Sequence, residues 1–87
     1  MSYEVRLRRL AQKGLDALSG RDYAKVDEAI TSLGENPRPR RVKKLDDSGL
    51  WRVRVGQCRI VYALDDKAQI VIIVRVARRK EDTYKGV

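Results

Sequence analysis

Three arginines in the segment Leu50–Leu64 could act together on an anionic group. The segment reads LWRVRVGQCRIVYAL, and Arg52 and Arg54 alternate with apolar residues as in a half-buried β-strand. Gly56-Gln57 suits a two-residue type II′ turn, with glycine at the first central position. A hairpin closed by this turn would place Arg54 opposite Arg59, with Arg52 on the same face.

The opposite face of this hairpin is predicted to be apolar. The same register pairs Trp51 with Tyr62, Val53 with Ile60, and Val55 with Cys58. Cys58 is therefore expected to be a small core residue rather than a nucleophile. Like charges that face each other across two strands destabilise a sheet, so the arginine cluster indicates an anionic ligand. The alternative is a solvated face whose charges are relieved by acids folding back from the flanking loops.

Composition limits what the chain can be. With 87 residues it is expected to form one domain, residues 1–87, with one modest core. The net charge of +8 and the pI of about 10.1 favour a polyanionic partner, either nucleic acid or an acidic protein. One cysteine and no histidine exclude a disulfide framework and argue against a zinc site. No apolar run could span a bilayer and no signal peptide is visible, so we expect a cytoplasmic location and no membrane partner.

Hydrophobic spacing predicts the elements that must position the hairpin. The predicted elements before the hairpin are a strand at Tyr3–Leu7, a helix at about Arg9–Leu18, a second helix at Tyr23–Leu33 with Gly34 at its C′ position, and an extended connection at Pro37–Pro39. After the hairpin comes an apolar strand, Ile70–Val76, which is expected to be covered on both faces. The predicted fold is α+β, in the order β-α-α-β-β-β, with two helices packed on one face of an antiparallel sheet.

The chemistry open to this chain is narrow, because it has neither a histidine base nor a glycine-rich phosphate loop. Arginines can hold a phosphate in a bidentate manner and stabilise the charge that develops during phosphoryl transfer. A tyrosine surrounded by guanidinium groups would have a lowered pKa and could act as a general base. RNA suits such a site, since its own 2′-OH can attack the neighbouring phosphate.

The sequence resembles the RelE/ParE superfamily of toxins from prokaryotic toxin–antitoxin modules. The resemblance covers almost the whole chain and rests on the order and spacing of its pieces. These are Tyr3–Leu18, the helix ending at Leu33-Gly34, Asn36–Pro39, Lys43–Leu45, Leu50–Gly56, Arg59–Tyr62, Val76–Arg79 and Tyr84.

The resemblance implies a microbial-ribonuclease-like fold. It also implies cleavage of mRNA in the ribosomal A site without a metal ion or other cofactor. In that scheme Tyr84 helps to activate the 2′-OH, and Arg59 and Arg79 bind the scissile phosphate. Arg52 and Arg54 add charge stabilisation, although lysines are common there and arginine is a poor proton donor. The products would be a 2′,3′-cyclic phosphate and a 5′-hydroxyl.

The remaining expectations concern partners and alternatives. We expect four further basic residues to bind RNA, namely Arg41, Lys43, Lys44 and Arg78. A toxin of this kind implies a cognate antitoxin in a hetero-oligomeric complex. Two alternatives keep the fold: a ParE-like inhibitor of DNA gyrase without nuclease activity, and a non-catalytic basic nucleic-acid-binding domain. The joint presence of Arg59, Arg79 and Tyr84 favours the nuclease.

Overall fold

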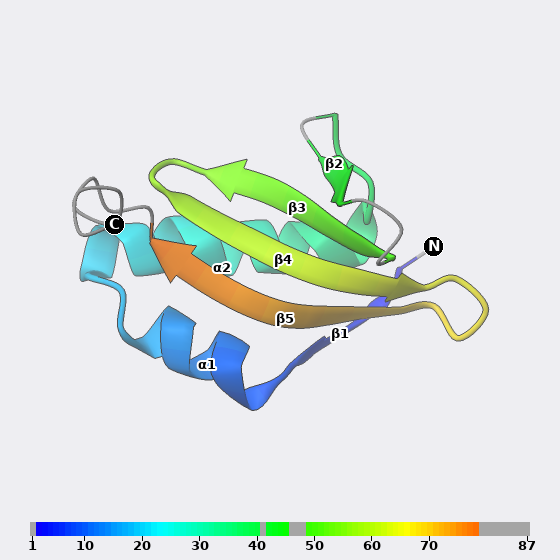
Figure 1. The fold of residues 1–87 in the computed structure, drawn as a ribbon, viewed down its shortest axis with the longest axis horizontal. Coiled ribbons are helices and arrows are strands. Elements are labelled where there is room, and N and C mark those ends of the chain that lie inside the picture. Colours follow the sequence, from blue (N-terminus) through cyan, green and yellow to red (C-terminus); the bar gives the residue numbers. More distant parts are fainter. Residues whose placement is uncertain (1, 41, 46–48, 79–87) are drawn as a thin grey trace.

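In the part of the chain that the structure describes, two helices pack on a five-stranded sheet (Figure 1). The computed structural model describes residues 2–40, 42–45 and 49–78. The elements in chain order are β1 (Glu4–Leu7), α1 (Arg9–Asp16), α2 (Gly20–Glu35), β2 (Lys43–Leu45), β3 (Leu50–Val55), β4 (Cys58–Asp65) and β5 (Ile70–Arg78). The α+β class is confirmed, and the six predicted elements follow one another in the predicted order, with one additional strand, β2, between α2 and the hairpin.

The sheet has the strand order β1-β5-β4-β3-β2. Strand β1 runs parallel to β5, and the other neighbouring pairs are antiparallel. The sheet is therefore mixed, and the prediction of an antiparallel sheet was wrong for β1, because two helices connect β1 to the remaining strands and bring the chain back to the other end of the sheet. The short strand β2 was not expected from the sequence, which indicated only an extended connection at this point. Strand β2 has only three residues and follows a proline-containing segment, so its alternation of polar and apolar residues is too short to predict a strand from the sequence alone.

Both helices pack on the same face of the sheet, as predicted. Helix α1 buries Ala11 and Leu15 against the core, and α2 buries Val26, Ile30 and Leu33. The apolar run of β5 suggested cover on both faces. Within the described part of the chain, however, no helix lies over the second face (Figure 1).

The helix ends differ slightly from the sequence-based boundaries. Helix α1 ends at Asp16, and α2 continues to Glu35, so Gly34 lies inside α2 rather than at its C′ position. Gly34 serves close packing instead: a Cβ there would lie 3.0 Å from Val5 Cγ2 and 3.1 Å from the carbonyl oxygen of Tyr3. The backbone N–H of Tyr3 also donates a hydrogen bond to the Gly34 carbonyl.

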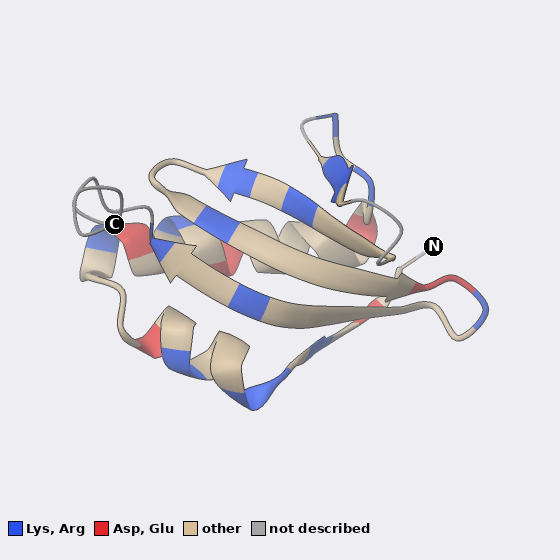
Figure 2. Ribbon diagram, in the orientation of Figure 1, with Lys and Arg blue, Asp and Glu red and all other residues tan. Residues whose placement is uncertain are grey.

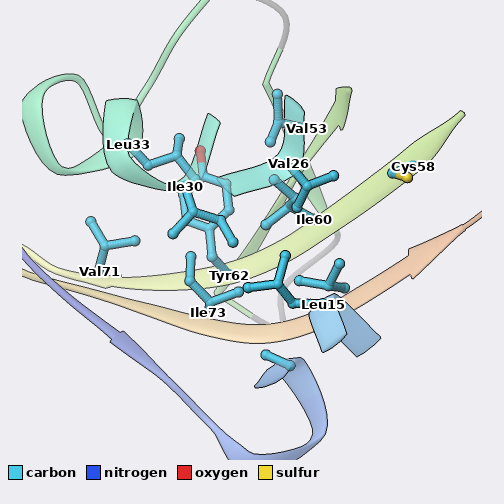
Figure 3. Close-up of a cluster of buried hydrophobic side chains, with 12 residues drawn as sticks. Leu15, Val26, Ile30, Leu33, Val53, Cys58, Ile60, Tyr62, Val71 and Ile73 are labelled. Carbon is cyan, nitrogen blue, oxygen red and sulfur yellow. The ribbon is translucent and has the colours of Figure 1, made fainter. Parts of the chain in front are cut away.

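The core lies between the helices and the inward face of β3, β4 and β5 (Figure 3). Tyr62 is its largest fully buried side chain. Its hydroxyl donates a 2.7 Å hydrogen bond to the carbonyl oxygen of Pro37. This contact fixes the Pro-rich connection to the middle of the sheet, so the connection enters β2 from a defined position.

A polar network holds the same connection from outside. Asp66, in the β4–β5 turn, accepts hydrogen bonds of 2.7 Å from both Tyr3 Oη and Arg38 Nη2. The Arg38 guanidinium also lies 5.2 Å from the centroid of the Trp51 ring, and the Lys44 ammonium lies 5.9 Å from it. Cation–π contacts of this kind attach β2 and its connection to β3.

Asp66 gives this network a pH dependence. The bond from Arg38 and then that from Tyr3 lower the pKa of the Asp66 carboxyl below its ordinary value of 3.8. A carboxyl with a lowered folded-state pKa contributes stability above its unfolded-state pKa and loses it as the pH falls through the folded-state pKa. We therefore expect the melting temperature of Asp66→Asn to fall less than that of the wild type between about pH 5 and pH 2.

Thermal unfolding followed by circular dichroism at several pH values would measure this difference. Asp27→Asn is the matched control, because the Asp27 carboxylate forms no ion pair with any described residue. If Asp66→Asn and Asp27→Asn lost stability in parallel with the wild type on acidification, Asp66 would not hold the connection as described.

Candidate nucleic-acid interface

The β3–β4 hairpin has the register that the sequence predicted. Arg54 lies opposite Arg59, and Trp51, Val53 and Val55 lie opposite their predicted partners Tyr62, Ile60 and Cys58. Gly56 has a φ of +59°, whereas Gln57 is not among the residues with positive φ. This combination is what a type II′ turn requires, and it explains why glycine stands first in the turn.

Five cationic side chains form a cluster on β2–β5, on the sheet face opposite the helices. They lie in two rows that run across the strands, and we call the set the basic face: Lys43, Arg52, Arg54, Arg59 and Arg75. One row holds Arg54 and Arg59, followed by Ala77 on β5. The second row, about 6.7 Å along the strands, holds Lys43, Arg52, Val61 and Arg75. Figure 2 shows the corresponding basic bands on β2, β3, β4 and β5.

The basic face has no acidic partners among the described residues. The three ion pairs in that part of the chain are Arg6–Glu4, Arg38–Asp66 and Arg78–Asp22, and none involves the basic face. Arg54 and Arg59 therefore stand on adjacent strands about 4.8 Å apart without a neutralising carboxylate. Their mutual repulsion costs folding free energy, and a bound phosphate would remove that cost.

Arg75 was missed in the sequence analysis. The surrounding segment Ile70–Val76 reads as one apolar strand expected to be covered on both faces, so its single arginine was not assigned to a site. The structure places Arg75 opposite Val61, two strands from Arg52. The only available signal was that a charged residue in an apolar strand must point to an uncovered face.

Other predicted RNA-binding residues lie elsewhere. The register places Lys44 on the Trp51 side of the sheet, where its ammonium contacts the Trp51 ring. Arg78 is also on the helix-packed side, with its Nε 3.6 Å from Asp22 Oδ2 and its Nη2 donating a hydrogen bond to Gln57 Oε1. Of the four predicted RNA-binding residues, Lys43, Lys44 and Arg78 are described, and among these three Lys43 alone belongs to the basic face. Arg41, Arg79 and Tyr84 lie outside the described residues.

The pKa shifts of candidate nucleophiles and bases argue against chemistry in the core. Burial raises the pKa of the Tyr62 hydroxyl to about 12 and also raises that of the Cys58 thiol. The hydrogen bond to Asp66 raises the pKa of Tyr3. Each of these groups is thus less ready to lose its proton than usual. The basic face itself supplies positive charge but no general base.

Over the described ranges, no cluster of three or more Cys, Asp or Glu side chains could hold a metal ion. Neither α1 nor α2, the helices of the described chain, is long and apolar enough to cross a membrane.

The chain is similar to known toxins over nearly its full length. The family model for the ParE toxin of type II toxin–antitoxin systems matches residues 5–83. The putative toxin RelE1 of Methanocaldococcus jannaschii is 33% identical over an alignment 92 residues long, gaps included, which covers 99% of each chain.

Solved structures give the same result. The RelBE2 toxin–antitoxin complex of Mycobacterium tuberculosis contains a chain with a TM-score of 0.80 and 34% identity, over 91% of this chain and 100% of that one. The archaeal RelE–RelB complex of Pyrococcus horikoshii gives a TM-score of 0.81 and 29% identity, over 93% and 99%. The isolated Escherichia coli RelE toxin, with a TM-score of 0.80 over 98% and 94% of the chains and 17% identity, shares the fold. The chain therefore belongs to the RelE/ParE family of type II toxin–antitoxin toxins.

Proposed function

We propose that this toxin is a ribosome-dependent endoribonuclease that cleaves mRNA without a metal ion and thereby inhibits translation. The observation that carries the proposal is the basic face, with five cations in two rows and no described acid paired to them. Its positive charge and its two rows suit the phosphate backbone of an RNA strand that lies across β3, β4 and β5.

The proposed reaction uses the RNA's own nucleophile. The Tyr84 phenolate takes the proton from a 2′-OH, and the 2′ oxygen then attacks the neighbouring phosphorus. The bond from phosphorus to the 5′ oxygen breaks, and that oxygen takes a proton from water. The hydroxide left by the water then takes the proton from the Tyr84 hydroxyl and restores the phenolate. The products are a 2′,3′-cyclic phosphate and a 5′-hydroxyl.

Arginines stabilise each charged stage of this reaction. Arg59 and Arg79 hold the scissile phosphate and the negative charge that grows on it. Arg52 and Arg54 stabilise the departing 5′ oxygen electrostatically, since arginine does not readily give up a proton. In this scheme the sheet supplies Arg52, Arg54 and Arg59, and the segment after β5 (residues 79–87, called the tail) supplies the base and one more arginine.

The proposal includes two partners. One is mRNA in the A site of the ribosome, which places the protein in the cytoplasm. The other is a cognate antitoxin, supported by the solved relatives from M. tuberculosis and P. horikoshii, which are toxin–antitoxin complexes. We expect the free toxin to arrest growth and the co-expressed antitoxin to restore it.

Purified ribosomes programmed with a defined mRNA would test the proposal. Wild type is expected to cut the mRNA and leave a cyclic phosphate at the new 3′ end. Arg79→Ala and Tyr84→Phe should each cut much more slowly. If both variants cut like wild type, the tail does not supply the groups assigned to it. If wild type leaves mRNA intact but inhibits DNA gyrase, the ParE-like alternative replaces the nuclease.

Arg75→Ala should weaken RNA binding without abolishing cleavage. Arg75 lies in the second row, away from the pair Arg54 and Arg59, so we expect it to hold a flanking phosphate. Loss of one phosphate contact should lower the slope of log affinity against log salt by about 0.7 for a single strand. Fluorescence anisotropy with a 2′-O-methyl RNA, which cannot be cleaved, measures this slope.

Arg21→Ala is the control for that experiment, because it removes the same charge from α2 on the opposite side of the sheet. Its salt slope should equal that of the wild type. Equal slopes for Arg75→Ala and Arg21→Ala would mean that Arg75 contributes only to the overall charge.

A further inference from the structure

Part of the sheet face opposite the helices is apolar. Ala63 of β4 and Ile72 of β5 are paired neighbours on this face, both are half-buried, and neither is among the residues packed against the core. A sheet face in contact with water normally carries polar residues at such positions. In the described ranges no helix covers this face. The two side chains therefore indicate an apolar contact that the phosphate site proposed above does not use.

The sheet register places these residues directly beside the basic face. The row that follows Lys43, Arg52 and Arg75 along the strands holds four apolar residues, which we call the apolar row: Leu45, Leu50, Ala63 and Ile72. On β3 and β4 this row lies two residues, about 6.7 Å, beyond the second basic row. Arg6 of β1 continues the row, and Glu4 forms an ion pair with its guanidinium. The apolar row thus offers apolar contact next to the cations, with the Arg6 charge already paired.

The next row along the strands carries negative charge. Asp65 of β4 and Glu4 of β1 lie on either side of Ile70 of β5. Figure 2 shows the acidic end of β4 beyond the tan stretches of β4 and β5. Acids in this row repel a phosphate, whereas the two basic rows attract it. An RNA strand on this face is therefore held with its phosphates over the basic rows and away from the acidic row.

This placement of the phosphates leaves two directions for the bases. A ribose joins each base to its phosphate, so the bases of a single strand lie to one side of its backbone. One side of the basic rows is the β3–β4 turn, where Gly56 and Gln57 are exposed. The other side is the apolar row. Unstacked bases bury their flat faces against aromatic and apolar side chains, so the second direction is the favourable one.

We propose that the apolar row binds nucleobases of the RNA strand whose phosphates lie on the basic face. The strand crosses β3, β4 and β5 with its bases directed toward the β4–β5 turn. Leu50, Ala63 and Ile72 have no side-chain hydrogen-bond donor or acceptor, so the row holds a base by burying its flat face and does not read its identity. This inference rests on the proposed function, because it assigns an orientation to the RNA at the same site.

A short RNA titrated into the methyl-labelled full chain tests this orientation. The probe is 2′-O-methyl hexaadenylate, which cannot be cleaved. Adenine rings packed on the apolar row should shift the Ile72 methyl signals upfield and leave those of Ile73, in the core, unchanged. Hexamers that each lack one base should include at least one that binds about fivefold more weakly and no longer shifts Ile72.

Three results of this titration would overturn the proposal. The first is no binding at low salt, or binding that leaves the Ile72 signals unchanged. The second is contact between Ile72 and residues 79–87 that persists when RNA is bound, because the chain itself would then cover the apolar row. The third is a shift of Ile72 that depends on protein concentration without RNA, which would assign the row to a second copy of the chain.

Two isoleucines on the same face of β5 give a matched pair of variants. Threonine keeps the β-branched shape that suits a strand, and it removes apolar surface. Ile72→Thr should weaken hexamer binding at least about threefold. The slope of its log affinity against log salt should equal that of the wild type, because no phosphate contact is lost. Ile70→Thr, in the acidic row, should bind like the wild type. Equal losses for both variants, or a changed slope for Ile72→Thr, would refute the proposed base contact.

The titration and the nuclease assay can fail separately, because the titration needs no ribosome. If the wild type leaves mRNA on ribosomes intact but hexaadenylate shifts Ile72, the nuclease proposal fails and the apolar row still binds bases. If the wild type cleaves mRNA on ribosomes but no base reaches Ile72, the nuclease proposal stands and the orientation inferred for the RNA is wrong.

Discussion

Replacing Arg59 with alanine is expected to slow ribosome-dependent mRNA cleavage by about 10²- to 10³-fold. Arg59 lies on β4 at the centre of the sheet, with Arg54 opposite it on β3 and Ala77 on β5. Its guanidinium is the group best placed to stabilise the negative charge that builds on a phosphate bound over the row that holds Arg54 and Arg59. Single-turnover cleavage with excess toxin, measured by primer extension, gives the rate of the chemical step.

The same change should not lower the free energy of unfolding. Arg59 forms no ion pair with the described residues, and its removal relieves repulsion from Arg54. A melting temperature equal to or above that of the wild type, together with slow cleavage, would therefore separate a functional loss from a folding defect. Cleavage at the wild-type rate, or a marked loss of stability, would contradict the role assigned to Arg59.

Arg59→Lys provides the matched control for charge. Lysine keeps the positive charge but loses the planar pair of N–H donors that can bind two phosphate oxygens at once. We expect a cleavage rate between those of Arg59→Ala and the wild type. If lysine restored the full rate, net charge alone would explain the contribution of Arg59, and bidentate geometry would be unnecessary.

The sequence predicted the centre of the basic face because the relevant information there is local. Alternation fixes the face on which Arg52 and Arg54 lie, and Gly56-Gln57 fixes how β3 pairs with β4. No distant contact is needed to place Arg54 opposite Arg59. The structure confirms each step of this inference.

The rest of the basic face depends on contacts between distant parts of the chain. Arg75 joins the second row only through the pairing of β4 with β5, which contains a register shift at Val61/Tyr62. Lys44 and Arg78 have the charge expected of RNA-binding residues, but Trp51 and Asp22 engage them on the other side of the sheet. Charge alone could not distinguish these two outcomes.

Gly14→Ala is expected to lower the free energy of unfolding by about 3 kcal/mol. A Cβ at Gly14 would lie 2.0 Å from the carbonyl oxygen of Val76 and 3.0 Å from its carbonyl carbon. Both are backbone atoms of β5, and Val76 is paired with Ile60 of β4. Neither partner can move aside as a flexible side chain could, so α1 must shift away from the sheet.

This expectation opposes the local preference of the helix. Alanine stabilises a helix interior by about 1 kcal/mol relative to glycine, so a site governed by propensity alone would become more stable. Gly20→Ala is the matched control: a Cβ at this first residue of α2 would meet no atom within 4 Å. Urea unfolding should therefore give a large loss in the free energy of unfolding for Gly14→Ala and no comparable loss for Gly20→Ala. If Gly14→Ala were as stable as Gly20→Ala, α1 could not lie as close to β5 as the structure indicates, and the support of the strand that carries Arg75 would need another explanation.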